Sequence, residues 1–197
     1  VEMASTGEVA CLGEDLPEAF LKAALATGFR LPERKQILVS IGTLRDKARF
    51  LPSARLLAGM GFTLYATRNT SRFLEENGVP NVRLYKIQER RRPSLLEYIS
   101  PDRLDLIINI PAGYDRKELT DGYIIRRRAI DYGIPLITNL QLAELFVKSI
   151  ATKTWRDLKA EPYDRYVADG PAGVRTAAPS PKTTAAPDRR TEADAAG

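Results

Sequence analysis

The chain has 197 residues, 44% of them hydrophobic, and a net charge of +5 from 30 basic and 25 acidic residues. It contains no histidine and one cysteine, Cys11, which excludes a disulfide framework, a cysteine zinc site, histidine-ligated metals and histidine-based catalysis. We therefore expect no metal site and a reducing compartment, the cytoplasm. No apolar run approaches the ~20 residues of a spanning helix and no signal-peptide pattern is visible, so we expect no membrane association.

Two hydrophobic periods alternate along the chain. A capping pattern of Asp15 and Glu18 predicts a first helix that ends near Gly28. Short apolar runs, typical of strands buried on both faces, occur at residues 37–41, 63–66, 82–85, 104–110 and 136–138. Helical spacing predicts helices at residues 50–58, 70–77, 94–99, 120–132 and 142–150, with Thr70 as the N-cap of the second. The fold class predicted is therefore α/β, with a doubly wound, five-stranded parallel sheet.

The end of the chain differs from the rest in composition. Residues 168–197 contain nine alanines and four prolines, and Val174 is the only large aliphatic residue there. Such a segment cannot bury enough apolar surface to offset the entropy lost on ordering. We expect residues 168–197 to be a disordered tail and residues 153–167 to be an extension that leads to it.

Polar side chains follow every predicted strand, at the edge where open parallel sheets bind ligands. They are Ser40, Lys47, Thr67, Thr70, Lys86, Asn109, Thr138 and Asn139. This set donates hydrogen bonds and contains no carboxylate, so it predicts a site for a phosphate or carboxylate anion rather than acid–base chemistry. The alternative for each threonine taken singly is a helix cap or a turn residue.

Two basic triplets occupy residues 90–92 and 126–128. No interleaved aromatic residues accompany them, so they do not predict a nucleic-acid site. We expect solvated faces or inter-domain salt bridges, with Arg91 or Arg92 near the ligand as the alternative.

Several stretches resemble a known family, the large chain of carbamoyl-phosphate synthetase. Residues 1–9 and 19–23 resemble the end of its second synthetase half. Residues 37–150 resemble its C-terminal regulatory domain, which is similar to methylglyoxal synthase. The best-matching stretches are residues 61–67, 106–109, 123–127 and 134–139.

The resemblance implies an allosteric domain of a larger chain. Residues 1–30 would be the end of the preceding synthetase domain and a linker helix, and residues 31–152 the methylglyoxal-synthase-like regulatory domain. In the family this domain binds an effector and alters carbamoyl phosphate synthesis, which serves pyrimidine or arginine biosynthesis and uses ATP and Mg²⁺ elsewhere in the enzyme. The partners implied are the rest of the large chain and a glutaminase subunit. The fragment itself is expected to be non-catalytic and to need no cofactor.

The family's effector contacts fall on Ser40, Lys47, Thr67, Thr70, Lys86 and Asn109. The resemblance favours a nucleoside monophosphate such as UMP or IMP, because Lys86 is present. N-acetylglutamate is the alternative, although that type of family member carries a tryptophan near residues 85–86 and an asparagine at Gly122. An animal-type member would lie in the mitochondrial matrix.

Two other functions remain open on the sequence. The first is a methylglyoxal-synthase-type lyase acting on dihydroxyacetone phosphate, whose chemistry requires an aspartate base and a histidine. This chain has Gln88-Glu89-Arg90 and Ile110-Pro111 where that family carries its aspartates. The second is a structural interaction module with a vestigial pocket. The sequence predicts neither the effector's identity, nor whether it activates or inhibits, nor the oligomeric state, nor a role for the tail.

Overall fold

A computed structural model describes residues 9–85, 89, 91–112, 119–154 and 156–168. The chain divides into two compact units, Val1–Glu161 and Pro162–Gly197, which are described separately. The described part of the second unit contains one short helix, α7 (Tyr163–Ala168). Helix α7 includes Ala168, the first residue of the predicted tail, and the remaining residues of that tail lie outside the described ones.

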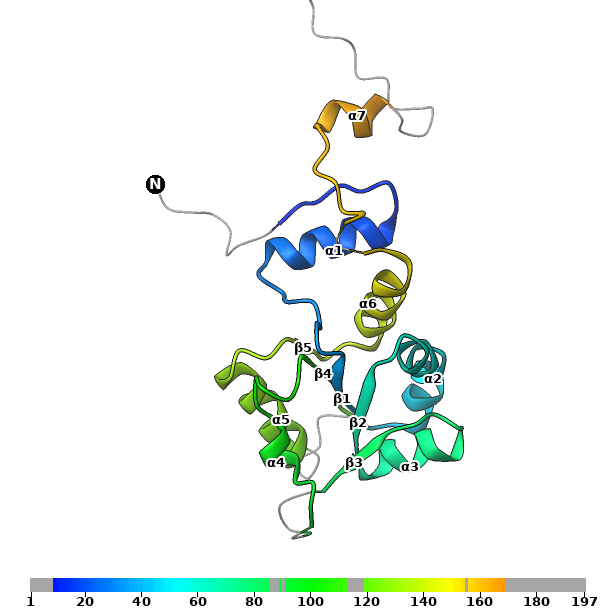
Figure 1. The fold of residues 1–197 in the computed structure, drawn as a ribbon, viewed down its shortest axis with the longest axis vertical. Coiled ribbons are helices and arrows are strands. Elements are labelled where there is room, and N and C mark those ends of the chain that lie inside the picture. The colour runs from blue at the N-terminus through cyan, green and yellow to red at the C-terminus, as the bar shows by residue number, and fades with distance from the viewer. Residues whose placement is uncertain (1–8, 86–88, 90, 113–118, 155, 169–197) are drawn as a thin grey trace, which may run out of the picture. The chain divides into compact units, whose positions relative to one another are not determined.

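The first unit is built on a five-stranded parallel sheet, as the alternating pattern predicted (Figure 1). Its strands are β1 (Gln36–Ile41), β2 (Thr63–Thr67), β3 (Val82–Leu84), β4 (Leu106–Ile110) and β5 (Leu136–Ile137). Their spatial order is β3-β2-β1-β4-β5. The chain therefore winds outward from β1 in one direction and then, from β4, in the other, which confirms the doubly wound fold.

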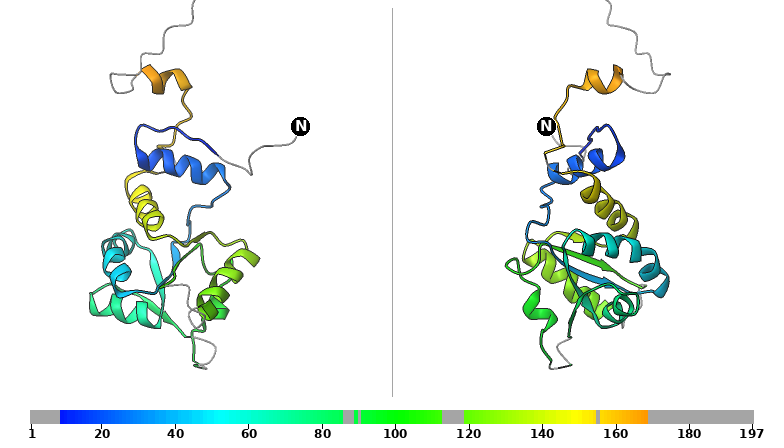
Figure 2. Two further views of the ribbon diagram at one scale, coloured as in Figure 1. Left: turned by 180° about the vertical axis from the view of Figure 1, so that it is seen from behind. Right: turned by 45° about the vertical axis from the view of Figure 1, so that its right-hand side comes forward.

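Helices cover both faces of this sheet (Figures 1 and 2). One face carries α2 (Leu44–Gly59), α3 (Arg68–Glu76) and α6 (Leu140–Thr152), and the other carries α4 (Leu95–Tyr98) and α5 (Leu119–Asp131). Successive residues of β1 alternate between them: Val39 belongs to the core beneath α2 and α6, and Leu38 to the core beneath α5. This two-sided burial explains why the strands appear in the sequence as continuous apolar runs.

A further helix, α1 (Leu16–Ala26), packs against α6. The carboxylate of Asp15 accepts a hydrogen bond from the backbone N–H of Glu18 at 2.9 Å, so the predicted N-terminal cap is confirmed. Asp15 also pairs with Lys153, just beyond α6, at 3.0 Å. After α1, the ring of Phe29 stacks at 5.4 Å on that of Phe146 from α6.

The predicted boundaries are wrong in two places that matter for the site. Helix α3 begins at Arg68 with Thr67 as its N-cap residue, and Thr70 lies buried inside the first turn. Helical spacing of apolar residues could not reveal this, because the first turn, Arg68-Asn69-Thr70, has no apolar member. Helix α2 begins at Leu44 rather than at residue 50, so it includes the predicted site residue Lys47. Differences of one to two residues affect the ends of the other elements.

Candidate anion-binding site

The strand register brings four polar side chains to one level of the sheet. Ser40 on β1 pairs directly with Asn109 on β4. If the pairing of β1 with β2 is extended by one residue, Thr67 lies beside Ser40. If the pairing of β4 with β5 is extended in the same way, Thr138, just after β5, lies beside Asn109. We call these four residues the polar row. It lies at the carboxyl ends of the strands, where the sequence predicted a ligand site.

An apolar row precedes the polar row by two residues on each strand. It consists of Tyr65, Leu38, Ile107 and Leu136, in the same register. Because side chains alternate along a strand, both rows face the same side of the sheet, the side covered by α4 and α5. On all four strands, therefore, the side chain two residues after the apolar row is a hydrogen-bonding one.

Contacts within the polar row are short and polar. The hydroxyl of Thr67 donates to Oγ of Ser40 at 3.1 Å. Asn109 is only 2% exposed, and its Oδ1 accepts from Nη1 of Arg126 on α5 at 2.9 Å. The row thus holds three hydroxyl groups, of Ser40, Thr67 and Thr138, and the amide of Asn109, and a guanidinium group reaches it from the covering helix.

Two other predicted site residues bind the end of β1 itself. The hydroxyl of Thr70 accepts from the backbone N–H of Ile41 at 3.0 Å and donates to the carbonyl of Ile41 at 3.2 Å. The ammonium of Lys47, 8% exposed in the first turn of α2, donates to the carbonyl of Gly42 at 3.1 Å. Thr70 therefore fastens α3 to the sheet, and its only hydroxyl hydrogen is already donated. Its role as an effector contact stays a prediction that would require this bond to exchange.

The remaining predicted residues are placed less directly. Thr138 and Asn139 are exposed, and the side-chain oxygen of Asn139 accepts from the N–H of Leu142 at 3.0 Å, so it caps α6. Lys86 lies outside the described residues.

The loops that follow β1 and β4 contact each other closely at the carboxyl ends of the strands. The N–H of Gly42 donates to the carbonyl of Ile110 at 2.8 Å. A Cβ atom on Gly42 would lie 2.3 Å from the backbone nitrogen of Ala112, a distance no side chain tolerates. Only glycine therefore lets the loop after β1 rest on the loop after β4.

The second basic triplet divides into three different environments. Arg126 reaches Asn109, whereas Arg127 pairs with Asp131 at 3.0 Å and Arg128 donates to the carbonyl of Leu96 at 2.9 Å. The prediction of a solvated face is wrong for Arg126. Its position could have been found from helical spacing, because it falls on one stripe of α5 with the buried Ile125 and Ala129.

Of the first triplet, Arg91 and Arg92 are described, and both are exposed. Arg91 lies 5.8 Å from the ring centre of Tyr85, and Arg92 is 3.7 Å from Glu97. The described contacts therefore place neither of them against the polar row.

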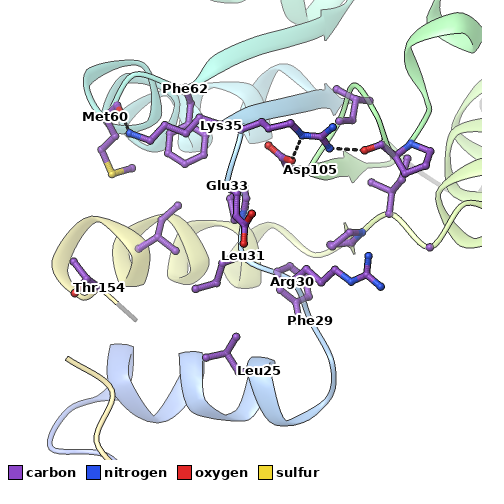
Figure 3. Close-up of a pocket in the computed structure, with 18 of the residues that line it drawn as sticks. Leu25, Phe29, Arg30, Leu31, Glu33, Lys35, Met60, Phe62, Asp105 and Thr154 are labelled. Carbon is purple, nitrogen blue, oxygen red and sulfur yellow. Dashed lines mark hydrogen bonds and ion pairs between the residues drawn. The ribbon is translucent and has the colours of Figure 1, made fainter. Parts of the chain in front are cut away.

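A separate cavity of about 1200 Å³ lies at the opposite, amino-terminal ends of the strands (Figure 3). Apolar side chains line it, among them Phe29, Leu31, Met60 and Phe62. Some of its charged groups have protein partners: Lys35 donates to the carbonyl of Met60 at 2.9 Å, and Arg34 pairs with Asp105 at 3.0 Å and donates to the Pro101 carbonyl. None of the residues predicted for the site lines this cavity.

Within the described ranges, no three acidic, cysteine or histidine side chains gather closely enough to hold a metal ion. The helices in those same ranges are all too short or too polar to cross a bilayer.

Comparison with known proteins identifies the family. Residues 49–138 match the family model of the MGS-like domain. This chain carries an MGS-like domain. The match begins within α2 and ends just after β5, so it includes Thr67, Asn109 and Thr138 of the polar row.

Similar stretches occur in much longer proteins. The chain is 44% identical over 156 residues to the multifunctional protein pyr1-3 of Dictyostelium discoideum, covering 77% of this chain and 7% of that protein. It is 42% identical over 167 residues to the multifunctional protein pyr-3 of Neurospora crassa, covering 81% of this chain and 9% of that protein. It is also 44% identical over 163 residues to the mitochondrial carbamoyl-phosphate synthase [ammonia] of Homo sapiens, covering 81% and 11%. This MGS-like domain is thus of the kind that carbamoyl-phosphate synthases contain, and the chain spans about a tenth of these relatives.

A crystal structure of methylglyoxal synthase from Elizabethkingia anophelis NUHP1 aligns with 73% of this chain and 97% of that one, at 20% identity and a TM-score of 0.45.

Proposed function

We propose that this MGS-like domain is the allosteric effector-binding part of a carbamoyl-phosphate-synthesising enzyme. Its effector would be a small anion, with a nucleoside monophosphate favoured over N-acetylglutamate. The observation that carries this proposal is the polar row: four strands in register change from apolar to hydrogen-bonding side chains at the edge where parallel sheets bind ligands.

The chemistry of the row favours an anion. Ser40, Thr67 and Asn109 supply hydroxyl and amide groups, and Arg126 adds a positive charge. A phosphate or carboxylate accepts hydrogen bonds only, so it complements such donors. The row itself holds no carboxylate that would repel it.

The same groups argue for binding without catalysis. The sequence has no histidine, and Asp105 lies at the opposite end of β4, where its carboxylate accepts from the N–H of Gln36 at 3.0 Å. Asp46, in the first turn of α2, accepts from the hydroxyl of Thr43 at 2.7 Å and so belongs to a helix cap. Neither is placed as a free base beside the polar row.

Effector binding would act on active sites elsewhere in the larger enzyme, which use ATP and Mg²⁺ and cooperate with a glutaminase. Such coupling between sites typically amounts to ~1–3 kcal/mol. Because the relatives are about ten times longer than the matched segment, the rest of the synthetase chain is the partner through which this coupling would pass.

A matched pair of substitutions on one strand tests the proposal. Thr67→Val removes a hydroxyl from the polar row, and Thr63→Val removes one from the other end of β2, where the residue is equally half-buried. UMP, IMP and N-acetylglutamate are first screened by thermal shift, and the Kd of the best effector is then measured by calorimetry. A neutral hydrogen bond is worth roughly 0.5–1.5 kcal/mol, so Thr67→Val should weaken binding about 2–12-fold and Thr63→Val should leave it unchanged.

The enzymatic alternative is tested in the same samples. Methylglyoxal released from dihydroxyacetone phosphate by the wild type, and lost in Thr67→Val, would replace the proposal with a lyase. Binding of none of the three effectors would contradict the proposal itself and favour a vestigial pocket.

A further inference from the structure

Arg126 occupies an unusual position for a charged residue of α5. The helix turns Ile125 and Ala129, 1% and 0% exposed, towards the sheet, and Arg126 lies on the edge of the same stripe. Its side chain is half-buried, and Nη1 donates to the buried Oδ1 of Asn109 at 2.9 Å. A guanidinium group is therefore held at the polar row by its neutral amide.

No acidic residue of the described ranges is paired with Arg126. In the described part of the chain it has no carboxylate within 4.0 Å, whereas the next residue, Arg127, pairs with Asp131 at 3.0 Å. A guanidinium group has five N–H donors, and the contact with Asn109 uses one. A partly buried cation with remaining donors is stabilised by an anion placed beside it.

Gly122, one turn earlier on α5, leaves the space in which this guanidinium lies. A Cβ atom built on Gly122 would be 3.0 Å from Nη1 of Arg126 and 3.6 Å from Oδ1 of Asn109. Any side chain at position 122 would thus crowd the contact between Arg126 and the row. The absence of a side chain at Gly122 therefore permits the hydrogen bond between Arg126 and Asn109.

We propose that Arg126 binds the effector directly, through the effector's anionic phosphate or carboxylate group. A planar guanidinium offers two parallel N–H groups to such an anion, which adds geometric selectivity that an ammonium group lacks. This inference rests on the proposed function and adds to it a residue that the sequence did not indicate.

The test compares two neighbouring arginines in the 197-residue chain. Arg126→Met and Arg127→Met remove the same charge and keep an unbranched stem, but only the first lies at the row. Each is titrated by calorimetry with UMP, IMP, N-acetylglutamate and inorganic phosphate. Hydrogen bonds to charged groups are worth roughly 1.5–3 kcal/mol, so Arg126→Met should weaken binding of the effective probe about 10–150-fold, with no change for Arg127→Met.

A double-mutant cycle separates direct contact from mere support of Asn109. If Arg126 acted only by holding Asn109, then Asn109→Ala and the double variant Asn109→Ala/Arg126→Met would bind equally well. We expect the double variant to bind at least tenfold more weakly than Asn109→Ala. Melting temperatures of all variants identify any that fail to fold, and Arg126→Lys, which restores the charge, should then recover part of the affinity.

The outcomes distinguish this inference from the proposed function. If a probe binds the wild type and Arg126→Met equally, or if the double variant loses nothing further, Arg126 is not an effector contact while the effector site stands. If no probe binds the wild type, the proposed function fails and the role of Arg126 fails with it.

Discussion

The carboxyl and amino ends of the strands differ in which polar groups they carry and in what those groups bind. At the carboxyl ends, strand register aligns Ser40, Thr67 and Asn109, and the guanidinium of Arg126, which pairs with no carboxylate of the described residues, reaches them. At the amino ends, a cavity of about 1200 Å³ is mainly apolar, and two of its charged groups, Arg34 and Lys35, are bound to protein atoms. We therefore favour the carboxyl ends for binding an anion, because the strand register there gathers hydrogen-bonding side chains beside an arginine.

At the amino ends of the strands, the contacts instead attach α1 and the segment after it to α6. Helix α1 and the segment that follows it are held to α6 by Phe29 on Phe146 and by the pair Asp15–Lys153. Backbone hydrogen bonding from Glu18 and the contact with Lys153 lower the pKa of Asp15, so this pair stays charged in weak acid. We expect substitutions at this end to change stability and substitutions at the polar row to change binding.

The largest effect expected is on stability, from Phe146→Ala. Phe146 is fully buried on α6 and packs against Phe29. Truncation of a buried phenylalanine costs about 3–5 kcal/mol, measured here as the free energy of unfolding in urea. Effector affinity of the folded fraction should not change. Leu142→Ala, on the same helix but 48% exposed, is the control and should cost far less.

Gly42→Ala should affect both properties, because Gly42 lies where the loops after β1 and β4 meet. The new Cβ would be 2.3 Å from the nitrogen of Ala112, so the loops must separate. Overpacking of this kind costs typically about 1–3 kcal/mol, and the displaced loops should also weaken effector binding. Gly59→Ala, which has no atom within 4 Å, should not destabilise the protein. Unchanged stability of Gly42→Ala would show that this contact is loose.

Glu18→Gln should have the smallest effect, and one that depends on pH. Burial raises the pKa of Glu18, but the hydrogen bond from Lys22 and the N–H of Glu14 outweigh it, so the net pKa lies below 4.5. A lowered pKa stabilises the fold above pH 4.5, and this contribution disappears as the pH falls below that value.

Glu18→Gln should therefore cost about 1 kcal/mol at pH 7, and the difference from wild type should shrink in acid. Thermal unfolding from pH 7 to pH 3 measures it, with the exposed Glu14→Gln as control. A constant difference across this range would contradict the assignment of the effect to the Glu18 carboxylate.

The sequence predicted the strands and the polar residues at their carboxyl ends for one physical reason. Strands buried on both faces must be apolar throughout, so their polar ends at Ser40, Thr67 and Asn109 are visible without a structure. The end of the first helix was equally readable, because the chain needs a positive φ at Gly28 (φ 79°).

What the sequence could not show depends on contacts between distant segments. Thr70 is a typical capping residue, but its hydroxyl binds the backbone of Ile41 from within a helix. The amino-end cavity forms only where the segment after α1 meets residues just before β2 and just beyond α6. Helical spacing could have placed Arg126 beside the buried stripe of α5, but it could not have shown the hydrogen bond to Asn109 on β4.

The measurement that tests the central claim most directly is a map of backbone amide chemical shifts in the ¹⁵N-labelled chain, titrated with UMP, IMP or N-acetylglutamate. We predict that the shifts cluster at Ser40, Thr67 and Asn109 at the carboxyl ends of the strands. Shifts confined to Phe29, Met60 and Phe62 around the amino-end cavity would contradict the account, because they would place the ligand at the end of the sheet opposite the polar row.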